Sequence, residues 1–519
     1  MTDITVAPRA VPRPFASTRN ACRLCAPLGA CIVFRGVEGC IPLIHGSQGC
    51  STYIRRYGIS HFREPIDIAS SNFTEASAIF GGRANLETAI ENVTRQYSPK
   101  VIGITSTCLS ETIGENVPMY LSEYKKTHAD EGNADAARPE LVYASTPSYR
   151  GSHMDGFHEA ICSLVQTLVP RKMLDAGMLD ATLPDADTLV PADRVKTCAI
   201  DSTVSTDSGM PARGVKTVDT DSSHSTDSGS RSRVNVISGF VSTEDLRELH
   251  DIMGSYDVPY TLLPDYSETL DGGSWSEYQK LPEGGTPVAD IRKMGEAAGT
   301  LYLSRVVPKE RDAGKWLESE HGVVLKSLYL PVGIEETDNF YRALEEVTGK
   351  KTPAKWTKIR GRLVDAYIDG HKYCAGKKAI VYGEEDFVCS MVSFLDEVGI
   401  APVIVATGSP SPEFADRIKA LLRNSKVACR IMDDADFATI VEAAKGLDAD
   451  IAIGNSKGQY ITRNLDVPLV RCGFPVHDRM GGQRILHLGY RGTLNLFDMI
   501  CNALMQEKQD AAKSGYTYI

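Results

Sequence analysis

The sequence lacks the features that would place it in a membrane, on a nucleic acid or outside the cell. No run of about eighteen apolar residues occurs, so no helix is expected to cross a bilayer. The chain has 56 Lys and Arg against 67 Asp and Glu, and this net charge of −11 argues against a binder of phosphate backbones. Residues 1–15 contain no continuous apolar core of a secretory signal. We therefore expect a cytoplasmic protein without membrane or nucleic-acid partners.

Cysteine, by contrast, is abundant, with thirteen residues in the chain. In a reducing cytoplasm these thiols are not expected to form disulfides, which points to metal or redox chemistry. Cys22 and Cys25 form a C-x-x-C pair, a pattern found in zinc sites and redox dithiols. No second such pair and no H-x-x-x-H follows it, and the residues before it are Pro-rich, so neither kind of site is favoured. Cys22, Cys31 and Cys40 are predicted to be structural.

The remaining composition is that of a globular protein, 42% hydrophobic and 24% charged. Short β-branched runs alternate with helical patterns, which predicts α/β architecture with three doubly wound, Rossmann-like domains and parallel sheets. The predicted strands are Val101–Thr105, Val234–Ile237, Ala379–Tyr382, Pro402–Ala406 and Ile451–Ile453. The predicted helices are Asn85–Tyr97, Thr243–Tyr256, Glu384–Val398 and Pro412–Asn424.

The predicted domain organisation has five parts. An N-terminal extension covers residues 1–20, and the first α/β domain, which contains all the cysteines clustered near the N-terminus, covers 21–194. Residues 195–232 form an insertion rich in Ser, Thr and Asp, in which Ser205–Gly209 recurs as Ser225–Gly229. Such a segment has too few apolar residues to form a core, so a flexible surface loop is predicted. The second and third domains cover 233–374 and 375–519, the last with a C-terminal helix.

Three cysteines stand out by their surroundings. Cys108 follows the strand Val101–Thr105, at the sheet edge where ligands bind in this architecture and where a helix N-terminus favours a thiolate. Cys50 ends the glycine-rich run His45–Cys50, whose free amides can donate to sulfides. Cys25 lies in a Pro/Gly segment predicted to be a turn. Any one alone would more often be a buried structural thiol; the three together indicate thiolate ligands to an iron–sulfur cluster.

Longer motifs identify a family. They are Cys25–Ala30, His45–Cys50, His61–Pro65, Thr107–Glu111, Thr146–His153 and Gly473–Arg479. These segments, in the same order along residues 20–505, resemble those of the β subunit of the nitrogenase catalytic component.

The resemblance implies a ligand set. Cys25, Cys50 and Cys108 would hold half of an 8Fe-7S P-cluster, the other half being held by an α subunit. Ser148 matches a serine whose hydroxyl can bind iron on oxidation. His45, Gly46, Gly49 and Thr107 are expected around the cluster, and His45 and His61 are expected to donate hydrogen bonds rather than bind iron.

The resemblance also implies partners. The chain would pair with the α subunit in an α2β2 heterotetramer and take electrons from an ATP-dependent iron protein. A larger iron–sulfur active-site cofactor would lie in the α subunit, so no catalytic residue is expected in this chain.

Other segments narrow the choice of family member. Arg479–Arg484 and Leu488–Gly492 look like the subunit that serves as scaffold for cofactor maturation, yet all three cluster cysteines are present. A scaffold-like C-terminal region together with three cluster cysteines resembles methylthio-alkane reductase, as do Leu263–Asp271 and Pro282–Pro287. This resemblance implies reductive C–S cleavage of methylthio compounds. The alternatives are the scaffold subunit, a dinitrogen-reducing β chain and a structural subunit without metal.

Three further patterns yield structural predictions. Gly370–Lys378 misses the Walker A phosphate-loop pattern by one residue and is predicted to lead into a strand. Gly383–Asp386 is predicted to be a strand-to-helix turn whose carboxylates favour the helix N-terminus. Arg63 and Glu64 are predicted to form an ion pair beside the cluster.

Overall fold

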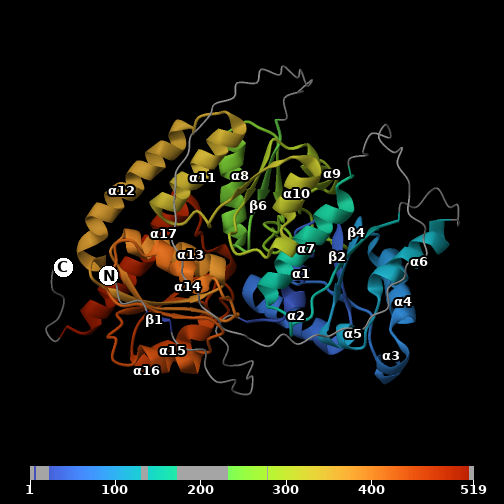
Figure 1. The fold of residues 1–519 in the computed structure, drawn as a ribbon, viewed down its shortest axis with the longest axis horizontal. Helices are drawn as coiled ribbons and strands as arrows, with labels where there is room; N and C mark the ends of the chain where they lie inside the picture. Colours follow the sequence, from blue (N-terminus) through green and yellow to red (C-terminus); the bar gives the residue numbers. More distant parts are fainter. Residues whose placement is uncertain (1–4, 7–22, 130–137, 172–231, 278, 513–519) are drawn as a thin grey trace, which may run out of the picture. The chain divides into compact units, whose positions relative to one another are not determined.

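The computed structural model describes residues 5–6, 23–129, 138–171, 232–277 and 279–512. Their parallel strands form three sheets, each with helices packed around it (Figure 1), which confirms the predicted α/β class with three doubly wound sheets. The predicted insertion lies outside the described residues apart from its last position. Among the described helices none is long and apolar enough to cross a bilayer.

The first sheet has the strand order β3-β2-β4-β5. Its strands are β2 (Cys40–His45), β3 (Ala69–Ser70), β4 (Val101–Ser106) and β5 (Glu140–Ala144). Its helices are α1 (Ala26–Arg35), α2 (Gln48–Phe62), α3 (Glu75–Phe80), α4 (Arg83–Tyr97), α5 (Cys108–Thr112), α6 (Val117–Ala129) and α7 (His153–Leu168). Since β2 and β4 are neighbours while β3 and β5 lie outside them, the topological switch point falls between the carboxyl ends of β2 and β4.

Alternating side chains of these strands serve two cores. Ile41 and Leu43 of β2 pack in one apolar cluster with α4 and α6, whereas Cys40 and Ile44 pack in another with α1 and α7. Because successive side chains point to opposite faces of a sheet, a continuous apolar run such as β2 is buried on both faces.

The second sheet has the order β7-β6-β8-β9. Its strands are β6 (Val234–Ile237), β7 (Tyr260–Leu263), β8 (Gly299–Tyr302) and β9 (Val324–Ser327), and its helices are α8 (Thr243–Ser255), α9 (Val288–Arg292), α10 (Ala313–His321) and α11 (Gly333–Thr348). The described residues also contain four short 3-10 helices. They are η1 (Met294–Glu296) and η2 (Lys309–Arg311) here, and η3 (Ser456–Gly458) and η4 (Gly482–Arg484) in the region of the third sheet.

The third sheet has the order β1-β12-β11-β10-β13-β14. Its strands are β1 (Thr5–Val6), β10 (Lys378–Gly383), β11 (Ala401–Thr407), β12 (Arg430–Met432), β13 (Ile451–Gly454) and β14 (Leu469–Arg471). The helices are α12 (Ala354–Cys374), α13 (Glu385–Glu397), α14 (Phe414–Leu421), α15 (Phe437–Ala444), α16 (Gln459–Leu465) and α17 (Gly489–Asp510). Thr5 and Val6, which the sequence assigned to an N-terminal extension, pair with β12.

Two of the sequence-based predictions for the third sheet differ in outcome. Gly383–Asp386 is a strand-to-helix turn, with Glu384 at the N-cap of α13 and Glu385 and Asp386 in its first turn, as predicted. The lead-in predicted for Gly370–Lys378 is wrong in its first half, because Gly370–Cys374 form the last turn of α12 and β10 begins only at Lys378.

Two glycines allow α1 and α7 to cross at backbone contact. A Cβ atom added at Gly29 would stand 1.8 Å from the carbonyl oxygen of His153, and one at Gly156 would stand 1.9 Å from that of Ala26. No side chain fits at either position, since these neighbours are backbone atoms. The crossing fixes the start of α1, and with it Cys25, against the start of α7 (Figure 1).

Candidate metal centre

The three predicted ligands each lie at the beginning of a helix. Cys25 is the N-cap of α1, Cys50 is the third residue of α2, and Cys108 is the first residue of α5. Cys50 and Cys108 therefore follow β2 and β4, the two strands that flank the switch point of the first sheet. Cys25 does not lie in a Pro/Gly turn as predicted, because Pro27 and Gly29 are inside α1.

Cys25 lies within electrostatic range of the other two thiols. Burial raises the pKa of the Cys25 thiol, a hydrogen bond with Ser148 lowers it, and the negative charges of Cys108 and Cys50 raise it further. Cys25 and Cys50 are half-buried and Cys108 is exposed, so the group is open on one side. Such mutual repulsion between thiolates is relieved when cations bind between them.

Ser148 connects two of the cysteines. Its backbone amide donates to Cys108 Sγ at 3.3 Å, and its Oγ accepts a hydrogen bond from the Ala26 amide at 3.1 Å. Ser148 lies after β5 in the sequence. It therefore links the carboxyl end of a third strand of this sheet to the segments that contain Cys25 and Cys108. The structure thus brings Ser148 together with Cys25 and Cys108, where the sequence predicted it.

Residues around Cys50 and Cys108 fix the two turns. Ser47 Oγ donates to Cys50 Sγ at 3.7 Å. Thr107 caps α5, since its Oγ1 accepts from the Ser110 amide, and the same hydroxyl donates to the His45 carbonyl at 3.2 Å. Gly46 is required because a Cβ there would meet Thr107 Oγ1 at 2.4 Å. Thr107 therefore joins the ends of β2 and β4.

The remaining predicted neighbours differ in their surroundings. Gly49 is exposed, and an added Cβ would have only Ser47 Oγ nearby, at 3.8 Å. The ring of His45 is buried, with Nδ1 3.1 Å from Ser71 Oγ and Nε2 3.2 Å from Glu115. Burial lowers the His45 pKa, partly offset by Glu115. Both ring nitrogens are thus occupied by protein groups.

His61 is fully buried away from the three thiols. Its Nδ1 accepts a hydrogen bond from the Val476 amide at 3.0 Å, and burial lowers its pKa to about 3. Arg63 donates to the His477 carbonyl at 2.6 Å, so the predicted ion pair with Glu64 is not formed among the described residues. The contacts of His61 and Arg63 instead join α2 to the loop that follows β14.

His153 forms hydrogen bonds with Leu24, the residue before Cys25. Its Nδ1 accepts from the Leu24 amide at 3.4 Å, and its own amide donates to the Leu24 carbonyl at 3.0 Å. Its Nε2 lies 2.7 Å from the carboxylate of Glu384, at the start of α13. At this distance the two groups can form an ion pair, but their orientation is not that of a hydrogen bond. His153 Nε2 and Glu384 Oε1 therefore have no hydrogen-bond partner. Cys25 is thereby positioned from the third sheet as well as the first.

The other early cysteines belong to the core. Cys31 and Cys40 are buried among apolar side chains, and burial raises the pKa of the Cys40 thiol to about 12. Such thiols stay protonated and are poor ligands, in agreement with the structural role predicted for them. Cys22 lies outside the described residues.

The donor set suits a group with several metal ions better than a single ion. Among the described residues no three His, Cys, Asp or Glu side chains converge on one point. The charges of Cys50 and Cys108 nevertheless act on the Cys25 thiol, so both lie close to Cys25 without sharing one centre with it. An iron–sulfur cluster fits this arrangement, because each thiolate binds a different iron.

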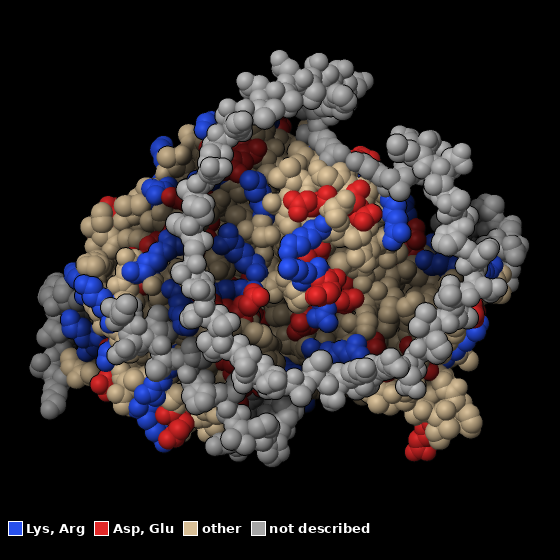
Figure 2. Space-filling model, viewed as in Figure 1, with Lys and Arg blue, Asp and Glu red and all other residues tan. Residues whose placement is uncertain are grey.

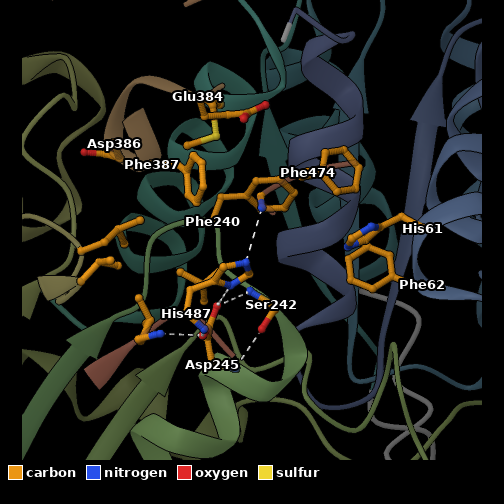
Figure 3. A pocket seen from close by; sticks show the side chains of 16 residues that line it. His61, Phe62, Phe240, Ser242, Asp245, Glu384, Asp386, Phe387, Phe474 and His487 are labelled. Atoms are coloured by element: carbon orange, nitrogen blue, oxygen red, sulfur yellow. Dashed lines mark hydrogen bonds and ion pairs between the residues drawn. The ribbon is translucent and has the colours of Figure 1, made fainter. Parts of the chain in front are cut away.

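Where the second and third sheets meet the first, the residues leave little free space (Figure 3). The rings of Phe240, Phe387 and Phe474 surround a cavity of about 30 Å³, with His61 and Phe62 on one side. A hydrogen bond of 2.8 Å joins His487 to Asp245 there. This space holds a few water molecules at most.

A wider cleft of about 450 Å³ opens nearby and is lined by charges of both signs, among them Arg305, Arg417, Glu385 and Glu413. Among the described residues no cysteine lines either space.

Two of the exposed side chains next to the thiols are large hydrophobic ones, whereas Gln48 and Arg150, which are exposed near Cys50 and Ser148 in the sequence, are polar. Leu109, which follows Cys108, is 38% exposed, and Tyr149, which follows Ser148, is 51% exposed. On the face seen in Figure 2, Lys and Arg stand among Asp and Glu instead of forming one basic field.

Some residues that shape this centre were not predicted. Ser47 donates to Cys50, and His153 makes two hydrogen bonds with Leu24. Burial raises the pKa of Tyr53, and Tyr57 and the charge of Cys25 raise it further. Ser47 lies inside the run His45–Cys50, so its position in that run was a usable signal. The other contacts join distant parts of the chain and have no local signal.

Comparison with known proteins gives one consistent result. The profile of the family described as "Nitrogenase component 1 type Oxidoreductase" matches residues 25–505. The nitrogenase molybdenum-iron protein beta chain of Clostridium pasteurianum is 32% identical over 490 residues, 94% of this chain and 93% of that protein. The corresponding beta chain of Methanothermobacter marburgensis is 31% identical over 489 residues, 93% of each.

Solved structures agree with the sequence matches. The structure of "Nitrogenase Cp1 at pH 6.5" superposes with a TM-score of 0.82 and 30% identity, covering 99% of both chains. A second chain, from "Nitrogenase Cp1 at pH 5", shares the fold with a TM-score of 0.61 at 14% identity.

Proposed function

The chain belongs to the family of nitrogenase component 1 type oxidoreductases as a β-type chain, and on that premise we propose that it relays electrons through an iron–sulfur cluster shared with an α subunit. Cys25, Cys50 and Cys108 bind the irons on this side, with Ser148 as an additional oxygen ligand in the oxidised state. The cluster is of the 8Fe-7S P-cluster type. The observation that carries the proposal is the gathering of three thiols at the switch point of the first sheet.

The open side of the centre supports a shared cluster. Cys108 is exposed, and the apolar side chains of Leu109 and Tyr149 beside it are exposed as well. A low-potential cluster needs protection from water, which these residues alone do not provide. A partner chain that brings further thiolates would cover this surface, and an α2β2 complex served by an ATP-dependent iron protein is the assembly proposed.

The protein's own groups then set the behaviour of the cluster. A bound cluster supplies one-electron transfer, and hydrogen bonds to its thiolates tune its potential. The Ser148 amide directs its N–H at Cys108, and Ser47 directs its hydroxyl at Cys50. Thr107 and His153 hold the backbone on which Cys108 and Cys25 are mounted.

The substrate-reducing cofactor is proposed to lie in the α subunit. The cavity of about 30 Å³ that Phe240, Phe387 and Phe474 surround is too small for a large iron–sulfur cofactor and has no thiol in its lining. We assign this chain to electron relay and docking, in the cytoplasm, where its thiolates stay reduced.

For the substrate we propose methylthio compounds, reduced with cleavage of a C–S bond. This rests on the sequence motifs of Leu263–Asp271 and Arg479–Arg484 combined with a full set of cluster cysteines. A dinitrogen-reducing enzyme is the second candidate, favoured by the identity of 32% to a molybdenum-iron protein beta chain. A scaffold for cofactor maturation is the third.

Purification with the native partner chain separates these candidates. The complex is assayed with its iron protein and ATP for methanethiol from methylthio compounds and for ammonia from dinitrogen. Methanethiol without ammonia supports the proposal, and ammonia as the main product supports the second candidate. A complex with only four-iron clusters and no turnover contradicts the relay function and supports the scaffold.

A further inference from the structure

Helices α12 and α17 pack at very short range along one stripe. Gly370 of α12 leaves no room for a side chain, since an added Cβ would stand 2.5 Å from the ring of Phe497 and 3.2 Å from Cys501 Sγ. The ring centroids of Tyr367 and Phe497 are 4.9 Å apart in the same contact. Residues four apart lie on one helix face, so Cys374, one turn after Gly370, faces α17 too.

The two thiols in this contact touch. Cys374 Sγ and Cys501 Sγ are 3.1 Å apart, although 127 positions separate them in the sequence. Cys374 is fully buried and Cys501 is 7% exposed. Since a disulfide bond is about 2.0 Å long, a relative shift of about 1 Å brings the sulfurs to bonding distance.

We propose that Cys374 and Cys501 form a dithiol that is oxidised to a disulfide by hydrogen peroxide, linking the end of α12 to α17. The inference is independent of the proposed function, because neither residue touches the candidate metal centre. Cys429 is also buried, and burial alone raises the pKa of its thiol, so no other thiol of the described residues acts on it.

The chemistry balances with peroxide as the oxidant. Peroxide reacts at Cys501, which keeps 7% of its surface accessible while Cys374 keeps none; a sulfur–oxygen bond forms, the O–O bond breaks, and water leaves. Cys374 then attacks the Cys501 sulfur, the S–S bond forms, the S–O bond breaks, and a second water leaves. Two thiols lose two electrons and two protons, and peroxide is reduced to two waters.

The disulfide would tie the C-terminal helix to the body of the protein. A cross-link stabilises mainly by restricting the unfolded chain, and more for longer loops. The loop closed here, from residue 374 to residue 501, is long. Oxidation is therefore expected to raise the unfolding temperature without moving either helix far.

The test uses the complex with its partner chain, purified without oxygen and then exposed to a small excess of hydrogen peroxide. Free thiols are alkylated, the protein is digested with trypsin, and the peptides are identified by mass spectrometry. The expected product is residues 373–377 joined to residues 492–508, lost on reduction. Recovery of both cysteines as alkylated thiols, as sulfinic acids, or linked to other cysteines overturns the proposal.

A second readout guards against variants that do not fold. Peroxide is expected to raise the unfolding temperature of the wild-type complex by a few °C. Cys501→Ala is expected to abolish that rise, and Cys429→Ala, at a buried cysteine without a neighbouring thiol, to retain it. A rise of equal size in Cys501→Ala, or no rise in the wild type, contradicts the cross-link.

Discussion

The backbone amide of Ser148 donates to the thiol of Cys108 at 3.3 Å, across 40 positions of the sequence. The hydroxyl of the same serine accepts from the amide of Ala26, next to Cys25. One residue thus ties together the turns that carry two of the three thiols. The two groups of Ser148 are also separable by mutation, because the amide remains when the hydroxyl is removed.

Ser148→Ala is expected to leave the iron content of the complex unchanged. It is expected to raise the midpoint potential at which the cluster is oxidised. The amide to Cys108 is retained, so the reduced cluster still assembles. Loss of the hydroxyl removes an oxygen that favours the oxidised irons, which raises the midpoint potential by roughly 60 mV for a tenfold loss of that stabilisation. Redox titration followed by electron paramagnetic resonance measures the shift.

The matched control is Ser145→Ala. Ser145 lies three residues before Ser148. Its hydroxyl donates to the Glu111 carboxylate and not to a residue beside one of the three cysteines. An equal shift in both variants would show that the effect is a general loosening of the loop, and the assignment of Ser148 as a ligand would fail.

Gly29→Ala is expected to destabilise the chain by about 1–3 kcal/mol, the usual range for overpacking. The added Cβ would stand 1.8 Å from the His153 carbonyl, so α1 and α7 must separate. Because Cys25 begins α1, iron content should fall as well. Urea unfolding and iron analysis of the complex measure the two effects.

Gly254→Ala provides the control for this change. Gly254 is also inside a helix, α8, but an added Cβ meets nothing within 4 Å. This variant is expected to be neutral or more stable by up to about 1 kcal/mol, since alanine favours helices over glycine. Similar behaviour of the two variants would contradict the close crossing of α1 and α7.

His61→Gln is expected to reduce the loss of stability in acid. His61 has a folded pKa of about 3 against an ordinary value of 6.5, so its contribution is fully present above pH 6.5 and is lost as pH falls toward 3. Without this group, the unfolding free energy should fall less steeply, by up to about 1.4 kcal/mol per pH unit in that window. The glutamine oxygen can still accept from the Val476 amide.

Urea midpoints at several pH values test this expectation, with His128→Gln as the control. His128 is partly exposed on α6; its Nδ1 contacts the Tyr124 carbonyl of the same helix, and its Nε2 lies 3.9 Å from the Glu91 carboxylate of α4. An unchanged pH dependence in His61→Gln, or an equal change in both variants, would show that His61 is not held neutral in the folded chain.

Much of the fold was predictable because buried parallel strands are continuous apolar runs. Val234–Ile237 was predicted with the bounds that β6 has, and Val101–Thr105 differs from β4 by one residue. The start of α1 was missed because Pro27 and Gly29 resemble a turn. Proline is tolerated in the first turn of a helix, and Gly29 is required by a helix crossing that no local pattern records.

The candidate site was predictable in part for the same reason. Cys50 and Cys108 follow strands, and the carboxyl ends of parallel strands meet at one edge of the sheet. The link from Ser148 to both cysteine turns and the hold of His153 on Leu24 are contacts over 122 and 129 positions. Such contacts depend on how α7 packs against α1, which is a property of the whole domain.

The central claim is that Cys25, Cys50 and Cys108 bind the irons of one shared cluster. Diffraction of the α/β complex at the iron absorption edge tests it directly, because anomalous peaks locate each iron without assumptions about the ligands. The account predicts several irons at the interface, with all three sulfurs within bonding distance of different ones. Irons found elsewhere, or none within bonding distance of these three thiols, would contradict it.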